Sequence, residues 1–125
     1  MKNLLDTHTV LWFLNGENLS DETLAVIQEN ENYISVVSLW EVAIKMSLNK
    51  LTFDGGFQAF CELVRKNGFE VLPIKDDYMQ KLFDLPFVHR DPFDRMIVAT
   101  AIIEDMTIIT ADNDIKGYSN VSCVW

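Results

Sequence analysis

The most informative stretch of this chain is DPFDRMIVATAIIED, residues 91–105. Asp91 is of a type favoured as a helix N-cap, and Pro92 suits the first helical position after it. Beyond Arg95 the stretch is apolar almost all round, which indicates a helix buried in the middle of the protein. Asp94 would lie in its first turn, where the helix dipole favours an acid. A carboxylate packed that deeply needs a partner, and a metal cation is a good one.

Short apolar runs alternate with helical patterns on either side of this stretch. Strands are expected at 3–5, 33–37, 69–74, 107–110 and 121–124. Helices are expected at 7–14, after the N-cap Ser20, at 38–48, around the apolar positions of 57–64, at 77–85 and at 91–105. Strands that alternate with helices are typical of a parallel sheet covered on both faces. The predicted fold is therefore α/β, a three-layer α/β/α sandwich around a central, mainly parallel sheet of about five short strands.

The length and composition bound the class of protein. The chain has 125 residues, which predicts one domain over 1–125, and 49% of them are apolar, which excludes a disordered chain. The formal charge is −9 and the pI is about 4.5. Such a surface has no general attraction for nucleic acid. A nucleic-acid substrate would need metal ions, a local basic rim or a basic partner to offset this charge.

The cellular location is predicted from cysteines and from the absence of targeting segments. Cys61 and Cys123 are the two cysteines, and free thiols in a reducing cytosol are the simplest interpretation. The N-terminus lacks the features of a signal peptide, and no apolar run is long enough to span a bilayer. We therefore expect a soluble cytoplasmic protein without a membrane partner.

Four acidic residues stand at the polar edges of apolar runs: Asp6, Glu41, Asp94 and Asp112. In an open α/β sheet, the ends of strands and the starts of the following helices share one edge, where ligands bind. The four carboxylates could therefore meet at one point. A dry cluster of carboxylates repels itself, and a divalent cation removes that cost. Ligands made only of oxygen suit Mg²⁺ or Mn²⁺, so the sequence predicts a metal site.

Each acid also has a purely structural explanation. Asp6 could cap the helix that follows it. Ser38 and Glu41 form the pattern of a capping box, and Glu41 and Lys45 form a favourable i, i+4 pair. Asp112 could simply form a turn. From the residues alone the two interpretations of Asp6 carry equal weight, and the structural interpretation of Glu41 is the stronger one.

Other polar residues lie beside these acids in the sequence. Thr110 precedes Asp112 by two positions and could orient a ligand or a water molecule. Arg90 and Arg95 flank the expected site and could bind phosphate, or could pair with local acids. The two histidines, His8 and His89, do not belong to a cluster with zinc-ligand spacing.

The order of these motifs resembles that of PIN domains. The motifs are Leu4-Leu5-Asp6-Thr7, Ser38-Leu39-Trp40-Glu41, Asp91-Pro92-Phe93-Asp94-Arg95-Met96 and Thr110-Ala111-Asp112. The segments Asp6-Thr7-His8-Thr9-Val10-Leu11-Trp12 and His89-Arg90-Asp91-Pro92-Phe93-Asp94-Arg95 further resemble the compact toxins of VapBC-type toxin–antitoxin pairs.

This resemblance covers nearly the whole chain and carries functional expectations. It implies a PIN-like fold and a Mg²⁺-dependent ribonuclease, with Mn²⁺ as a possible substitute. It implies Asp6, Glu41, Asp94 and Asp112 as catalytic and metal-binding residues. It also implies a homodimer that cleaves RNA and is inhibited by a small cognate antitoxin. The negative charge fits that partner, because a basic antitoxin tail could place an Arg or Lys among the carboxylates.

Two other classes of protein remain open from the sequence. A haloacid-dehalogenase-like phosphatase would use Asp6 as its nucleophile, but it requires a second Asp two positions later, where this chain has His8. A non-catalytic acidic α/β binding domain would use the same acids only as caps, and would bind no Mg²⁺.

Overall fold

Five short strands form one parallel sheet in the computed structural model, which describes all 125 residues. The strands are β1 (Lys2–Leu5), β2 (Glu31–Ser35), β3 (Glu70–Leu72), β4 (Thr107–Ile109) and β5 (Cys123–Val124). They lie in the order β3-β2-β1-β4-β5, and every neighbouring pair is parallel. The predicted α/β/α sandwich with a central parallel sheet is confirmed.

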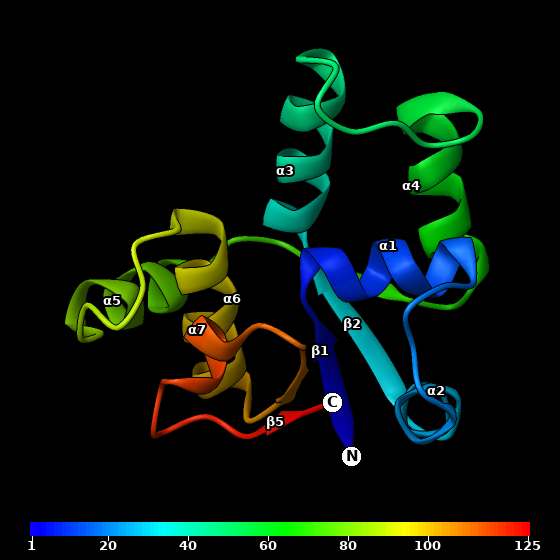
Figure 1. Cartoon of the computed structure of the whole chain (residues 1–125). Helices are drawn as coiled ribbons and strands as arrows, with labels where there is room; N and C mark the ends of the chain where they lie inside the picture. Colours follow the sequence, from blue (N-terminus) through cyan, green and yellow to red (C-terminus); the bar gives the residue numbers. More distant parts are fainter.

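Seven helices cover the two faces of this sheet (Figure 1). They are α1 (Thr7–Asn15), α2 (Asp21–Gln28), α3 (Val36–Ser47), α4 (Gly56–Lys66), α5 (Asp76–Asp84), α6 (Pro92–Glu104) and α7 (Asn113–Lys116). Figure 1 shows α5, α6 and α7 on one side of β1 and β2, with α1, α2 and α4 on the other. No helix is both long enough and apolar enough to span a membrane.

Alternating side chains of the strands divide the apolar interior into two cores. Leu4 and Ile108 point to one face and pack with buried residues of α5, α6 and α7. Leu5 and Ile109 point to the other face and pack with α1, α2, α3 and α4. Successive side chains of a strand point to opposite faces, so two adjacent apolar residues feed both cores. Ile97 in α6 is fully buried, as the apolar pattern of that helix predicts.

Several predicted boundaries differ from the structure by one or two residues, and the one between β2 and α3 affects the site. The strand expected at 33–37 ends at Ser35, and α3 begins at Val36 rather than at Ser38. The Oγ of Ser35 caps the helix by accepting from the Val37 N–H, so the expected capping box of Ser38 and Glu41 does not form. The β-branched pair Val36-Val37 favours a strand locally, but tertiary packing places it in the first helical turn.

The strand order creates a crevice at the carboxyl edge of the sheet. From β1 the chain proceeds outward through β2 to β3, and then returns to the other side of β1 to form β4 and β5. Ligands of open α/β sheets bind where the strand order reverses in this way, here between β1 and β4. Leu5 pairs with Ile109, so Asp6 and Thr110 emerge side by side at this point.

Candidate metal centre

Asp6 is fixed at the end of β1 by bonds to both carboxylate oxygens. Its Oδ1 accepts from the Thr9 N–H at 2.8 Å and so caps α1. Its Oδ2 accepts a short hydrogen bond from the hydroxyl of Thr110, at the end of the neighbouring strand. The carboxylate is only 3% exposed, so it is an oriented anion at the reversal point of the sheet. The capping role is confirmed, whereas the predicted metal binding by Asp6 stays a prediction.

A second group of donors lies at the same edge. His89, Asp94 and Asp112 each offer one ligand atom, and these atoms lie within 4.8 Å of one another. The Nε2 atom of His89 is 2.8 Å from Oδ2 of Asp94. Asp94 occupies the first turn of α6, and Asp112 caps α7 by accepting from the Asp114 N–H at 2.8 Å. Two of the four predicted acids therefore converge, together with a histidine that the sequence interpretation left out of the site.

The electrostatics of this group show an incompletely compensated negative charge. Burial raises the pKa of the Asp94 carboxyl from 3.8 to about 6, although the hydrogen bond to His89 acts in the opposite direction. Burial lowers the pKa of His89, but the hydrogen bond to Asp94 and the nearby carboxylates outweigh it, so the net shift is upward. Both shifts favour a proton between these side chains, in the place where a cation would also neutralise them.

Glu41 is buried beside this edge but has other partners. Its Oε1 accepts from the Thr7 hydroxyl at 2.7 Å, and its Oε2 forms an ion pair with Lys45 at 2.7 Å. The predicted i, i+4 pair is therefore confirmed. The same Thr7 hydroxyl lies 2.9 Å from Oγ of Ser38, which is buried inside α3. Glu41 thus faces the segment after Asp6, and its predicted role at a metal stays a prediction.

A small cavity connects Asp6 with Asp112. Its volume is about 160 Å³, and its lining is Asp6, His8, Trp12, Ala111 and Asp112. Asp112 belongs both to this lining and to the group with His89 and Asp94. This cavity is large enough for a hydrated ion. Asp112 therefore links the two groups: it lines the cavity with Asp6, and it lies in the donor cluster with Asp94.

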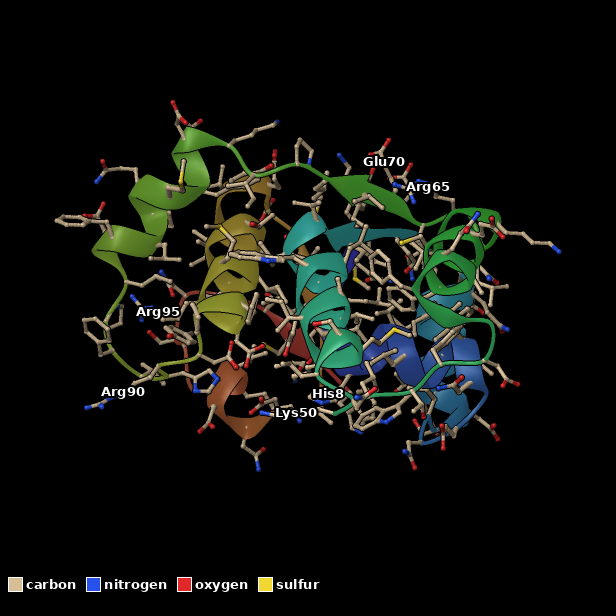
Figure 2. All side chains as sticks on the ribbon, turned by 90° about the horizontal axis from the view of Figure 1, so that it is seen from above. His8, Lys50, Arg65, Glu70, Arg90 and Arg95 are labelled. Carbon is tan, nitrogen blue, oxygen red and sulfur yellow. The ribbon has the colours of Figure 1, made fainter.

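The two arginines occupy different environments. Arg95 is 5% exposed, and its guanidinium donates to four backbone carbonyls, those of Leu82, Leu85, Pro86 and His89, and to the Tyr118 hydroxyl. It forms no ion pair with an acid, and its bonds organise the segment that carries His89. Arg90 is exposed, and Figure 2 shows it projecting away from the protein while Arg95 points inward between α5 and α6. Of the two, only Arg90 is free to reach a phosphate without rearrangement.

The donors present here suit a divalent cation. Two carboxylates and one imidazole in a half-buried crevice supply negative charge and oxygen and nitrogen ligands at a workable spacing. Thr110 does not point into open space, because its hydroxyl bonds Asp6 and accepts from the Asp112 N–H at 3.0 Å. The threonine thereby positions both acids relative to each other.

Comparisons with known proteins identify the family and agree with the fold. A family model described as the PIN domain matches residues 4–121. The crystal structure of VapBC2 from Rickettsia felis, bound to a promoter DNA fragment, aligns with a TM-score of 0.75 at 17% identity, covering 99% of this chain and 98% of that chain. VapBC-5 from Mycobacterium tuberculosis aligns with a TM-score of 0.69 at 25% identity, covering 98% and 97%. Among curated proteins, none matches the sequence significantly.

Proposed function

This chain belongs to the PIN domain family, and on that premise we propose that it is a metal-dependent endoribonuclease, the toxin of a type II toxin–antitoxin pair. The observation that carries the proposal is the convergence of His89, Asp94 and Asp112 at the reversal point of the sheet, next to Asp6. The family match also speaks against the haloacid-dehalogenase-like alternative, because it assigns the chain to a different family.

Asp6, Asp94 and Asp112 would hold the cation, with Glu41 directly or through a water molecule. A bound Mg²⁺ or Mn²⁺ would supply Lewis-acid chemistry, which acidifies a water molecule and polarises the scissile phosphate. The cavity lining and the donor cluster contain no serine or cysteine, so a water molecule would be the attacking group. The burial of Asp6 and the bond from Thr110 keep its carboxylate oriented before substrate arrives.

RNA would reach this acidic protein through the cation and through Arg90. The formal charge of −9 opposes binding of a polyanion, so the local positive charge at the crevice has to offset it. Arg90 is exposed one residue after His89, so its guanidinium is available for a phosphate of the bound strand. A role for Arg95 in phosphate binding would require it to give up bonds to backbone carbonyls. We expect the activity to be located in the cytoplasm, where RNA substrates are available.

The partner that fits this surface is a small basic antitoxin. A carboxylate-lined crevice attracts a Lys or Arg side chain, which would compete with the cation and inhibit cleavage. The similar structures from Rickettsia felis and Mycobacterium tuberculosis are VapBC proteins, the latter described as a member of a family of toxin–antitoxin systems. Co-expression with the adjacent gene product, followed by purification of a complex, tests this proposal. A chain that is always isolated without such a partner would count against it.

A homodimer is the proposed assembly. Exposed apolar side chains gather on α5 and the loop after it, with Phe83 and Phe87 each 82% exposed and Met79 48% exposed. Met79 and Phe83 are one helical turn apart on α5, and exposed apolar surface of this kind is typical of protein–protein interaction sites. Sedimentation analysis of the wild type and of Phe83→Asp tests whether a dimer forms and whether it uses this surface.

Cleavage of total cellular RNA by the purified protein tests the enzymatic proposal. Mg²⁺ or Mn²⁺ should support cleavage, a chelator should stop it, and mapping the 5′ ends of products should reveal the preferred sites. Asp94→Asn should abolish cleavage while retaining the fold. Asp54→Asn removes the same charge from an exposed loop and should cleave like wild type. Full activity of Asp94→Asn would overturn the proposal.

A parallel assay separates this function from the alternatives. Turnover of an aryl phosphate without RNA cleavage would favour a phosphatase. The absence of Mg²⁺ and Mn²⁺ binding in calorimetric titrations would favour a non-catalytic binding domain.

A further inference from the structure

A metal site made only of acidic residues does not explain why His89 lies beside Asp94. It comes from the loop between α5 and α6, and that loop is tied down by Arg95, which donates to the carbonyls of Pro86 at 2.9 Å and His89 at 3.4 Å. The side chain of His89 is 18% exposed, and its ring lies against Asp94. Arg95 holds the backbone of His89 and Asp94 holds its ring, so the imidazole is oriented before any ligand binds.

The spacing of the donors fits direct binding of one cation. Two ligands at right angles around a cation, each about 2.1 Å from it, lie about 3.0 Å apart. The observed distance between Nε2 of His89 and Oδ2 of Asp94 is 2.8 Å. Asp112 supplies the third donor within 4.8 Å of both. A cation could therefore take the place of the hydrogen bond between His89 and Asp94 with only small side-chain movements.

The other ring nitrogen of His89 lies near a carboxylate, the kind of group that orients many metal-binding histidines. Its Nδ1 lies 3.6 Å from Oδ2 of Asp114, slightly longer than a hydrogen bond. Histidines that bind metals almost always donate their second N–H to a carboxylate or a carbonyl, which fixes the tautomer and the ring orientation. Asp114 would tighten onto Nδ1–H when Nε2 turns from Asp94 to a cation.

We infer that His89 is a direct metal ligand through Nε2, beside Asp94 and Asp112, and that this site binds transition-metal cations such as Co²⁺, Zn²⁺ or Fe²⁺ in preference to Mg²⁺. This inference rests on the proposed metal-dependent function. Imidazole nitrogen suits these borderline cations, whereas Mg²⁺ selects oxygen and retains its water. A site made of carboxylates alone has no such nitrogen donor. His89 would therefore increase the ratio of the affinity for these transition-metal cations to the affinity for Mg²⁺.

The competing role for His89 is indirect. It could only hydrogen-bond Asp94 and orient that carboxylate toward the cation. Loss of His89 would then weaken the binding of every cation by a similar factor, because the Asp94 carboxylate contributes to the binding of each. The two roles therefore differ in the ratio of affinities and not in the absolute affinity.

The test compares Co²⁺ and Mg²⁺ binding to wild type, His89→Gln and His8→Gln, with Co²⁺ followed by its visible absorption and Mg²⁺ by calorimetry. His8→Gln is the matched control, because it removes the only other imidazole, which lines the cavity beside Asp6. His89→Gln should lower the Co²⁺ affinity by roughly 100-fold and the Mg²⁺ affinity by about threefold or less. His8→Gln should leave the ratio of the two affinities unchanged.

A measurement on the wild type removes any dependence on the folding of the variants. Pulsed electron paramagnetic resonance of the Mn²⁺-loaded protein should detect the nitrogen of a directly bound imidazole, and His89→Gln should lose that signal. An equal loss of affinity for Co²⁺ and Mg²⁺, or a nitrogen signal that disappears in His8→Gln instead, would overturn the inference while leaving the nuclease proposal intact. A wild type that binds neither cation would overturn both.

Discussion

Replacing Asp94 by Asn should make the metal-free protein more stable while removing the proposed nuclease activity. Burial raises the pKa of Asp94 from 3.8 to about 6, so its ionised form is disfavoured in the folded state. A difference of about two pKa units corresponds to about 3 kcal/mol, and the side chain is only 16% exposed, so solvent screening reduces this little. Loss of the hydrogen bond from His89 offsets about 1 kcal/mol of this gain. The net expectation is about 2 kcal/mol, or roughly 6–10 °C in Tm.

The pH dependence has a definite sign. The folded-state pKa of Asp94 lies above its unfolded value, so the contribution of Asp94 to the stability of the wild type is greatest below about pH 4 and is lost as the pH rises through about 6. The pKa of His89 is also raised, so its contribution in the wild type is likewise lost as the pH rises. The advantage of Asp94→Asn should therefore be absent at pH 4 and complete at pH 8.

Thermal and urea unfolding in a chelator measures this difference, with Asp54→Asn as the control for a change in net charge. Excess Mn²⁺ should stabilise the wild type, because a cation that binds only the folded state shifts the folding equilibrium toward that state. The difference in stability between Asp94→Asn and the wild type should therefore become smaller. Asp94→Asn should respond little to Mn²⁺. If Asp94→Asn is no more stable than wild type at pH 8 in chelator, the charge of Asp94 is already compensated and the reasoning is refuted.

Three further substitutions test other contacts. Lys45→Met leaves the buried carboxylate of Glu41 without its ion pair and should lower the free energy of unfolding in urea by about 1–3 kcal/mol. If Glu41 joins the metal site, Mn²⁺ should restore this stability, and a failure to restore it would argue against that role. Arg95→Lys cannot reproduce the five hydrogen bonds of the guanidinium, so we expect the free energy of unfolding to fall by about 2–4 kcal/mol. Hydrogen exchange over residues 86–91 should become faster, and unchanged exchange would contradict the structural role of Arg95. Tyr78→Phe removes a bond to Glu104 and should cost about 1 kcal/mol at pH 7. Burial raises the pKa of Tyr78 to about 12, so the wild type should lose stability as the pH rises from about 10 to 12, and a variant with the same alkaline loss would refute this assignment.

The sequence predicts the fold well because apolar runs determine it. The short apolar run with Leu4 and Leu5, which ends at Asp6, favours a strand with both faces covered, and the structure places the two leucines in opposite cores. The central helix was predictable because it is apolar on every side. The carboxyl edge followed from the strand order, so the placement of Asp6 and Asp112 near one another was also predictable.

The wrong and missing parts arose where tertiary contacts override local pattern. Val36 and Val37 favour a strand locally but lie in the first turn of α3, which removed the expected cap at Ser38. His89 lies in a loop, where no periodicity predicts the direction of a side chain. Its only sequence signal was its distance of five residues from Asp94, which becomes informative once Arg95 is known to fold that loop back.

The hydrogen bond between Thr110 and Asp6 joins residues that are 104 positions apart. The crevice is therefore assembled from the end of the first strand, the loop before α6 and the turn after β4. Only a piece of chain that spans residues 6–112 contains all three. A fragment that ends before Thr110 lacks the hydrogen bond that orients Asp6, and it also lacks Asp112, which belongs to both the cavity lining and the donor cluster. If the proposed nuclease activity is correct, fragments released by interrupted translation or by a cut within the connecting segments should therefore be inactive, because none of them contains the complete crevice.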